Sequence, residues 1–568
     1  MKGFSILLIA VACTLSAIAQ NVEQVIKSDP LQLSGGVTNS SIWTNNKGSG
    51  TSAYSLYLSG NMNLNIAGFL NIPVSFAYTN RQLTKSCTSP FNRLSLSPQF
   101  KWIKAYIGYG SMSFSKYTMS GREFMGGGVE LSPKDKWKIM AFGGRLQKAV
   151  EATEYADASL KMCGGGFLLG YNAENFSISA NVIKVKEFSS SLPYSPSDSA
   201  YVVPRDNVAA SLNARVNILH NLSLSGEYAM SFLSRMAEAD SVNGAWFFDS
   251  HGDVITYHAG KTALAYKIPI GSVDLYYERI DPNYTTLGTY YNTDDFERIG
   301  LKSQLQIAEK LNVGANIGYQ HDNLENQDVN SNSQFAYEVD LYIRPTEKLS
   351  VGLSASNNQE YVHVRDIIEL VSQTHQYQNL DTLSYTELNL SLSSSASYQI
   401  DNNENLPQTL SGSFSYQRSS HDQALYTKFV SNKIRNVNMS YSLNHAPSNM
   451  NAGLSFNWNN TLTPENVSDV YTASLSASCP VGKLLKLSVS SSYSMVRSVD
   501  KYNILNSRVS ASCLLFSHHS LNLNISYLDN NSSSLTQKTQ LSANLTYSYS
   551  FGASLKREDN HLSFKPDF

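Results

Sequence analysis

The feature that most restricts the fold of this chain is an alternation of apolar and polar residues at a period of two. Between Tyr54 and Tyr78 the even positions are mainly apolar, and the odd positions are mostly serine and asparagine. Successive side chains of a β-strand point to opposite faces, so this run predicts a hairpin with one apolar and one polar face. The same pattern recurs at 311–319, 335–343, 437–443, 452–458, 521–527 and 541–551.

The runs have the length and the ends expected of strands that cross a membrane. Each has about the 9–11 residues that a tilted strand needs to span a bilayer. Aromatic residues gather at the ends of runs, as at Tyr319, Tyr441 and Trp458, where an amphipathic ring would lie at the level of the lipid headgroups. After residue 19, no stretch holds the roughly 18 consecutive apolar residues of a transmembrane helix.

The connections between runs alternate between short and long. Short links fall at 132–135, 220–221, 309–310, 345–348, 447–449 and 481–483. Longer polar segments lie at 80–91, 149–158, 187–204, 234–256, 282–294, 359–383 and 419–432. We therefore predict an all-β fold, a large antiparallel transmembrane β-barrel of about 26 strands (about 24–28), with short periplasmic turns and longer extracellular loops. A soluble extracellular β-sandwich array is the alternative, but it does not explain the aromatic ends and the loop alternation together.

Composition supports one repeating architecture outside the cytoplasm. Charged residues make up 15% of the 568 residues, against about 25% in an average soluble domain. The net charge of -2, without a basic stripe, excludes a nucleic-acid partner. Ala17-Ile18-Ala19 before Gln20 is typical of a signal-peptidase site. We expect a signal peptide (1–19), a short periplasmic segment (20–30), the barrel (31–556) and a C-terminal tail (557–568), in the outer membrane of a Gram-negative cell.

Several stretches in the first part of the chain also resemble a known group of proteins. They are Asp29–Gly36, Tyr57–Asn61, Ile72–Phe76, Leu96–Trp102, Ser113–Gly121 and Gly126–Leu131. Together they resemble the outer-membrane barrel proteins predicted in Bacteroidota, a group without a biochemical assignment. The resemblance covers about residues 29–150. It implies an outer-membrane location and no particular reaction.

We find no pattern that predicts catalysis, a cofactor or a metal. The triplets Gly126–Gly128 and Gly164–Gly166 lack the following Lys-Ser/Thr of a phosphate loop, so they indicate bends or close backbone approach. The spacing of Glu151, Glu154 and Asp157 matches no calcium loop, which favours a solvated acidic loop. The four cysteines after the signal peptide are widely spaced and form no zinc or redox motif. They are Cys87, Cys163, Cys479 and Cys513.

A barrel of this size encloses a lumen that needs a plug. The residues 20–30 are too few for a folded plug domain, so we expect inward loops or a separate periplasmic protein to occupy the lumen. The chain would then be a conduit or partner-binding scaffold embedded in outer-membrane lipid. The alternative is a passive porin-like channel for polar solutes, since we expect an inward face made largely of serine, asparagine and glycine. An outer-membrane enzyme is a third class and has no supporting residues.

One stretch of the expected lumen is charged and not merely polar. By parity, eight residues on three runs point inward: Asp274, Tyr276, Glu278, Arg298, Lys302, Glu338, Asp340 and Arg344. These charges either pair across neighbouring strands and stiffen the wall, or form a contact patch for whatever occupies the lumen. The sequence leaves both accounts open.

Overall fold

The computed structural model describes most of the chain between residues 30 and 566. The described ranges are 30–45, 54–80, 93–152, 158–194, 202–234, 254–290, 294–322, 324–325, 333–357, 390–400, 403–421, 430–463, 466–499, 501–532, 539–558 and 561–566. The expected signal peptide lies outside them. Among the described residues, no helix is long and apolar enough to cross a membrane.

The described chain is almost entirely β-strand. The first fourteen strands are β1 (Leu31–Thr44), β2 (Tyr54–Ile66), β3 (Leu70–Thr79), β4 (Arg93–Leu96), β5 (Gln99–Phe100), β6 (Ile103–Ser111), β7 (Glu123–Leu131), β8 (Trp137–Gln147), β9 (Lys161–Asn172), β10 (Phe176–Phe188), β11 (Asp206–Leu219), β12 (Leu222–Ser234), β13 (Val254–Ile268) and β14 (Gly271–Ile280).

The other fourteen strands follow in the same hairpin order. They are β15 (Phe296–Ile307), β16 (Leu311–Asp322), β17 (Ser333–Thr346), β18 (Leu349–Asn357), β19 (Leu390–Gln399), β20 (Gln408–His421), β21 (Val430–His445), β22 (Met450–Leu462), β23 (Val467–Val481), β24 (Leu485–Arg497), β25 (Lys501–Leu515), β26 (His519–Asn530), β27 (Thr539–Glu558) and β28 (His561–Pro566). Short 3-10 helices lie at Pro133–Asp135, Ser189–Ser191, Ala308–Lys310 and Ala446–Ser448.

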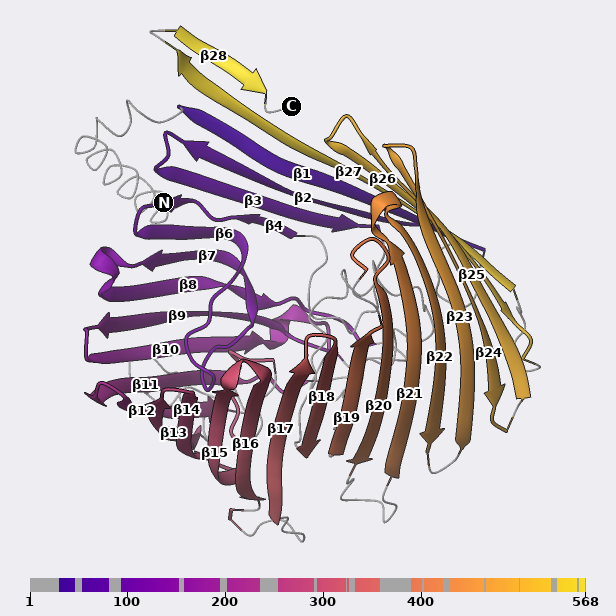
Figure 1. Cartoon of the computed structure of the whole chain (residues 1–568). Helices are drawn as coiled ribbons and strands as arrows, with labels where there is room; N and C mark the ends of the chain where they lie inside the picture. Colours follow the sequence, from indigo (N-terminus) through magenta and orange to yellow (C-terminus); the bar gives the residue numbers. More distant parts are fainter. Residues whose placement is uncertain are drawn as a thin grey trace.

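The sheet closes on itself between its first and its penultimate strand. β1 pairs with β2 on one side and with β27 on the other, from Leu31 opposite Leu555 to Thr44 opposite Ser542. β4 and β5 share one place between β3 and β6, and β28 pairs only with β27, outside the ring. The wall is thus a closed antiparallel barrel of 26 strands (Figure 1), which confirms the predicted fold class.

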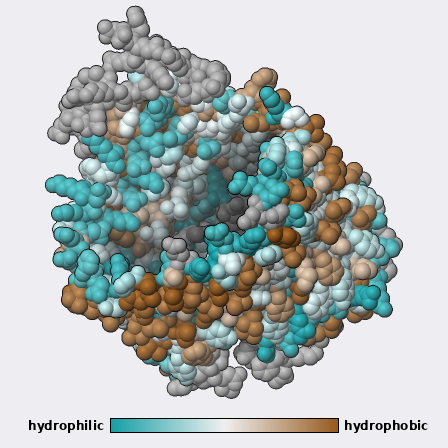
Figure 2. All heavy atoms as spheres, viewed as in Figure 1, coloured by the Kyte–Doolittle hydropathy of each residue, from teal (hydrophilic) through white to brown (hydrophobic). Residues whose placement is uncertain are grey.

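The outer face of the barrel is the apolar one. Met62 and Tyr78, on the apolar face of the first hairpin, are 38% and 48% exposed, and Tyr319 on β16 is 50% exposed. Figure 2 shows hydrophilic residues around the central hollow and hydrophobic residues across the outer surface of the lower and right-hand walls. An apolar belt of this kind suits lipid and not water, so the barrel spans a membrane.

The two rims differ as the sequence predicts. Short turns join β2 to β3, β7 to β8, β9 to β10, β11 to β12 and most later odd-numbered strands to the next strand, up to β25 and β26, with a longer connection at 400–407 between β19 and β20. Most of the connections on the other rim are longer. The start of β1 and the end of β27 both lie on the short-turn rim, since they pair with each other there. His518 and His519 lie at the short turn between β25 and β26.

The inner face differs between the two halves of the barrel. From β7 to β15 it carries large buried apolar side chains, which form two clusters. The larger cluster includes Phe124, Met140, Phe142, Met162 and Ile183, each at most 7% exposed. The expectation of an inward face made of serine, asparagine and glycine is therefore wrong for this part of the wall. The physical reason is that two loops fold into the lumen and cover it.

Glycines leave the space that these loops occupy. A Cβ atom on Gly128 would lie 2.6 Å from Cε of Met112, and one on Gly166 would lie 2.7 Å from the ring of Phe114. Within the strands, a Cβ on Gly126 would lie 2.1 Å from the carbonyl oxygen of Gly143. The glycine triplets thus mark close approach, as the sequence indicates.

Candidate functional site

Two connections on the long-loop rim turn inward and pack against the barrel wall. Loop A, residues 112–122, follows β6 and forms a small hairpin with a bridge between Ser115 and Met119. Loop B, residues 281–290, follows β14. In Figure 1 the chain after β6 runs across the inner side of the neighbouring strands. The sequence predicted 282–294 as an external loop, whereas the described part of it packs inside the barrel.

The two loops are bonded to each other. The hydroxyl of Tyr284 donates to the carbonyl oxygen of Tyr117 at 2.6 Å, and Oγ1 of Thr286 donates to that of Thr118 at 2.8 Å. Nη1 of Arg122 donates to the carbonyl oxygen of Thr289 at 2.7 Å. These bonds satisfy backbone carbonyl groups that are buried from solvent, so loops A and B form one unit.

Buried asparagines of the wall hold that unit in place. Oγ1 of Thr118 donates to Oδ1 of Asn181 on β10 at 2.6 Å. The backbone N–H of Leu287 donates to Oδ1 of Asn207 on β11 at 3.0 Å, and Asn207 is fully buried. Because each buried polar group left unpaired costs about 1–3 kcal/mol, these bonds also specify where the loops sit.

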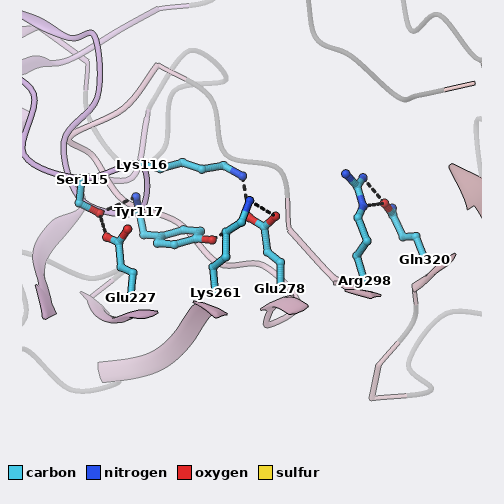
Figure 3. Close-up of polar contacts among 8 residues, drawn as sticks. All are labelled: Ser115, Lys116, Tyr117, Glu227, Lys261, Glu278, Arg298 and Gln320. Atoms are coloured by element: carbon cyan, nitrogen blue, oxygen red, sulfur yellow. Dashed lines mark hydrogen bonds and ion pairs between the residues drawn. The ribbon is translucent and has the colours of Figure 1, made fainter. Parts of the chain in front are cut away.

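A cluster of charged and hydroxyl groups joins loop A to β12, β13 and β14 (Figure 3). The carboxylate of Glu278 lies 2.6 Å from Nζ of Lys116 and 3.6 Å from Nζ of Lys261, and it accepts from the hydroxyl of Tyr117 at 2.7 Å. Ser115 donates to the carboxylate of Glu227. Glu278 is 3% exposed, so its charge needs these partners to remain buried.

The tyrosines of the two loops are held neutral. Burial raises the pKa of Tyr117, and the neighbouring carboxylate of Glu278 raises it further. Burial also raises the pKa of Tyr284. Both hydroxyls therefore remain protonated hydrogen-bond donors at physiological pH. The bond from Tyr117 to Glu278 and the bond from Tyr284 to the carbonyl oxygen of Tyr117 are kept.

The predicted charged patch is only partly brought together. Glu278 contacts loop A, and Lys261 of β13 lies 4.8 Å above the ring of Tyr276, whose hydroxyl donates to Asn316 at 2.8 Å. Arg298 lies opposite Glu278 in the register but bonds instead to Gln320 on β16. Glu278 and Arg298 therefore form no ion pair with each other, and Lys116 and Lys261 lie beside that carboxylate instead.

The other members of the patch have no ion-pair partner among the described residues. Asp274 lies opposite Lys302 in the register of β14 and β15, yet the two form no ion pair within 4.0 Å. Glu338, Asp340 and Arg344 lie on β17, on the polar face of that strand. The role of the patch as a partner contact stays a prediction.

Sequence reasoning missed loop A as a lumen segment, although a signal was present. Where a strand is covered on both faces, apolar residues should appear at both parities. Leu168 and Leu169 on β9 are an example, since Leu168 is buried inside and Leu169 is 41% exposed outside. Val182 and Ile183 on β10 repeat this pattern. The loss of alternation over β7–β11 thus predicts a lumen segment packed against these strands.

The inner wall from β18 to β27 is different in chemistry. Hydroxyls of neighbouring strands pair there: Ser455 with Ser474 at 2.5 Å, Thr472 with Ser494 at 2.8 Å and Ser526 with Ser542 at 2.6 Å. Among the residues that the structure describes, neither hydrophobic cluster of buried residues extends to these strands. This part of the wall presents small polar groups to the lumen.

The described residues hold no group of three or more His, Cys, Asp or Glu that could ligate a metal. Glu154 and Asp157 of the acidic segment lie outside the described ranges, as does Cys87. Cys163, Cys479 and Cys513 are free thiols. The described site therefore offers hydrogen bonds, charge and packing.

No protein-family model and no curated protein matches the sequence. Among solved structures, the P pilus usher PapC translocation pore aligns with a TM-score of 0.40 and 12% identity, over 91% of this chain and 99% of that one. The ferric enterobactin receptor PfeA of Pseudomonas aeruginosa aligns with a TM-score of 0.37 and 9% identity, over 91% of this chain and 80% of that one. OccAB2 of Acinetobacter baumannii has a TM-score of 0.28 and 8% identity, over 66% and 97%. None of these similarities says what this chain binds or carries.

Proposed function

We propose that the protein is an outer-membrane conduit whose own loops A and B narrow one side of the lumen and leave the polar wall of β18–β27 as the surface of passage. The observation that carries this proposal is the contrast between the two inner faces. Loops A and B are bonded to each other and to buried wall residues, whereas the opposite wall presents paired serine and threonine hydroxyls.

The size of the barrel favours an open conduit over a lumen that loops A and B fill completely. With strands about 4.8 Å apart and tilted by about 40°, a round barrel of 26 strands would be roughly 50 Å across between opposite backbones. Two loops packed against one wall leave much of such a lumen to water, to other segments or to a partner. A separate periplasmic or lumen-filling protein remains part of the proposal.

The porin-like alternative is favoured by one observation, the nearly uncharged inner face of β18–β27. Hydroxyls and amides form hydrogen bonds with polar solutes without selecting strongly for the sign of their charge. A passive channel would use the same wall, and it would conduct without any partner.

Single-channel conductance of the purified barrel tests the proposal. The comparison is between the native chain, a variant in which residues 113–121 are replaced by a Gly-Ser linker, and a Lys116→Gln/Glu278→Gln variant. We expect the linker variant to conduct several-fold more than the native chain, because the constriction is gone. A Ser526→Ala/Ser542→Ala variant on the opposite wall is the control and should conduct like the native chain.

The outcomes separate the candidate functions. Equal conductance of the native chain and the linker variant, both folded by heat-modifiable migration on gels, would show that loops A and B do not constrict the lumen. A large, steady conductance of the native chain without a partner supports the passive channel.

The predicted charged patch gives a test for a lumen partner. If the patch contacts a partner, Arg298→Ala/Lys302→Ala and Glu338→Ala/Asp340→Ala variants should retain less of it, with a dependence on salt because partly exposed charges are screened over about 8–10 Å. Co-purification at low and high salt measures this. Unchanged retention in both variants would leave these residues as wall chemistry.

A further inference from the structure

A hollow lies in the inner wall of β17–β21, away from loops A and B. Its volume is about 160 Å³, and its lining consists of serines, two glycines, one alanine (Ala396), one asparagine and one tyrosine. The lining side chains on the polar parity of their strands are Tyr342, Ser350, Ser395, Ser397, Ser411, Ser413, Asn438 and Ser440, with Gly352 between them.

The register explains why the wall is hollowed here. Tyr342 lies opposite Gly352, and the same row continues across the next strands through Ser395 and Ser413 to Asn438. Glycine and serine keep the middle of the row low, while the larger tyrosine and asparagine stand at its ends. With neighbouring strands about 4.8 Å apart, the row forms a shallow trough that runs across the strands.

Most of the polar groups in the trough have no protein partner. Within the described part of the chain, the hydroxyls of Ser350, Ser395, Ser413 and Ser440 make no hydrogen bond, whereas Ser397 and Ser411 in the same trough pair with each other. Serines elsewhere on this wall also pair across strands. The Oδ1 atom of Asn438 is buried and has no hydrogen-bond partner. The trough therefore offers unpaired serine hydroxyls, which can donate and accept, and the amide oxygen of Asn438, which can accept from a ligand.

The aromatic end adds an apolar surface. Tyr342 is 42% exposed, so much of its ring is accessible from the lumen side. No charged residue lines the hollow among the described residues, which gives neither a cation nor an anion a preferred partner. A fitting ligand is neutral, carries many hydroxyls and has an apolar face that packs on a ring.

We propose that this hollow is a binding subsite for a neutral saccharide chain, which rests on the proposed role of the β18–β27 wall as the surface of passage. The serine hydroxyls and Asn438 would pair with sugar hydroxyls, and the ring of Tyr342 would pack on the apolar face of one sugar unit. Polar side chains that fix orientation beside an aromatic ring are the usual composition of a small-ligand site.

Binding in solution tests this without any transport assay. The purified barrel, in a detergent without sugar headgroups, is titrated with maltohexaose and cellohexaose, and saturation-transfer NMR reports contact and the dissociation constant. Polyethylene glycol of matched length is the negative probe, since it lacks hydroxyls along its chain. We expect transfer to at least one hexasaccharide and none to polyethylene glycol.

Variants then locate the contact. Tyr342→Ala should weaken binding about tenfold, and Tyr342→Phe should retain most of it, because the ring and not its hydroxyl supplies the apolar surface. Ser395→Val/Ser413→Val should weaken binding by a similar factor, while the matched pair Ser526→Val/Ser542→Val, on the same polar wall but outside the hollow, should leave it unchanged. Each variant must first migrate as a folded, heat-modifiable barrel.

Three results would overturn the proposal. They are the absence of transfer to either hexasaccharide, binding that is unaltered by Tyr342→Ala and by Ser395→Val/Ser413→Val, and equal competition by an uncharged Gly-Ser peptide. Binding is measured without conductance, so a failure of loops A and B to constrict the lumen and a failure of the hollow to bind sugar give different results.

Discussion

The strands β7–β15 and the strands β18–β27 belong to one wall and one hairpin repeat, yet their inner faces differ in chemistry. The first set, with loops A and B, is the packed sector: its inner side chains are buried and its strands are covered on both faces. The second set is the polar sector, whose inner hydroxyls pair across strands. Only the outer face of a barrel strand has to be apolar. The composition of its inner face depends on whether a loop or water lies against it.

The largest expected difference between the sectors lies in their response to loss of a side chain. Phe142 packs against Phe114 of loop A at 5.6 Å and against Phe124 at 4.9 Å between ring centroids. Phe142→Ala should lower the free energy of unfolding by about 3–5 kcal/mol, through lost burial and the cavity left behind. Ser474→Ala in the polar sector should change it by about 0.5 kcal/mol or less. Urea unfolding of the barrel in lipid measures both, and similar losses would mean that loop A is not packed on the wall.

The next effect separates the two faces of a single strand at the edge of the packed sector. On β16, Val313 shares the outer face with Tyr319, while the neighbouring Gly314 points inward and has room for a side chain. Val313→Arg should cost about 2–4 kcal/mol because a charge at the bilayer midplane is poorly solvated. Gly314→Arg should assemble normally. The yield of heat-modifiable barrel reports the result, and equal assembly of the two variants would mean that this face does not meet lipid.

A smaller effect is expected where glycine makes room for a loop. Gly166→Val places atoms against Phe114, Ile183 and Phe142 and should cost about 1–3 kcal/mol by overpacking. Gly453→Val, on the inner face of the polar sector, meets only the flexible hydroxyl of Ser476 at close range. Trypsin cleavage at Lys116 should rise in the first variant alone, because loop A is displaced. Protection of Lys116 in Gly166→Val would show that the loop tolerates the side chain.

The smallest effect is expected for Asp274 and Lys302, which lie opposite each other in the register but form no ion pair. A double-mutant cycle on Asp274→Asn and Lys302→Gln should give a coupling energy of about 0–1 kcal/mol. The cycle on Lys116→Gln and Glu278→Gln should give a larger one, because the carboxylate of Glu278 is buried. If the first coupling equalled the second, Asp274 and Lys302 would be a true wall pair.

The barrel and the facing of its residues were predictable because alternation is a local property. The outward position of Val313 and the inward position of Glu278 follow from parity within one strand. The packed sector was harder to predict because loop A meets loop B across a sequence separation of more than 150 residues, as in the bond from Tyr284 to Tyr117. Local period does not encode such a contact, although the paired apolar residues Leu168 and Leu169 indicate that something covers the strand inside.

The ion-pair partners of Glu278 also could not be predicted from local sequence. In the register of β14 and β15, Arg298 lies opposite Glu278. Which cation the carboxylate binds depends on Lys116, which arrives from another part of the chain. Pairing within the sheet can be predicted from the strands, whereas pairing with a lumen segment requires the tertiary fold.

The seam between β1 and β27 has a consequence for the order of assembly. Leu31 pairs with Leu555, so the ring cannot close before nearly the whole chain has reached the membrane. Until then the growing sheet has two open edges, whose free N–H and C=O groups can join any strand they meet. Contacts between residues so far apart in sequence also form slowly. These edges therefore stay exposed until β27 pairs with β1, and that pairing removes both edges at once.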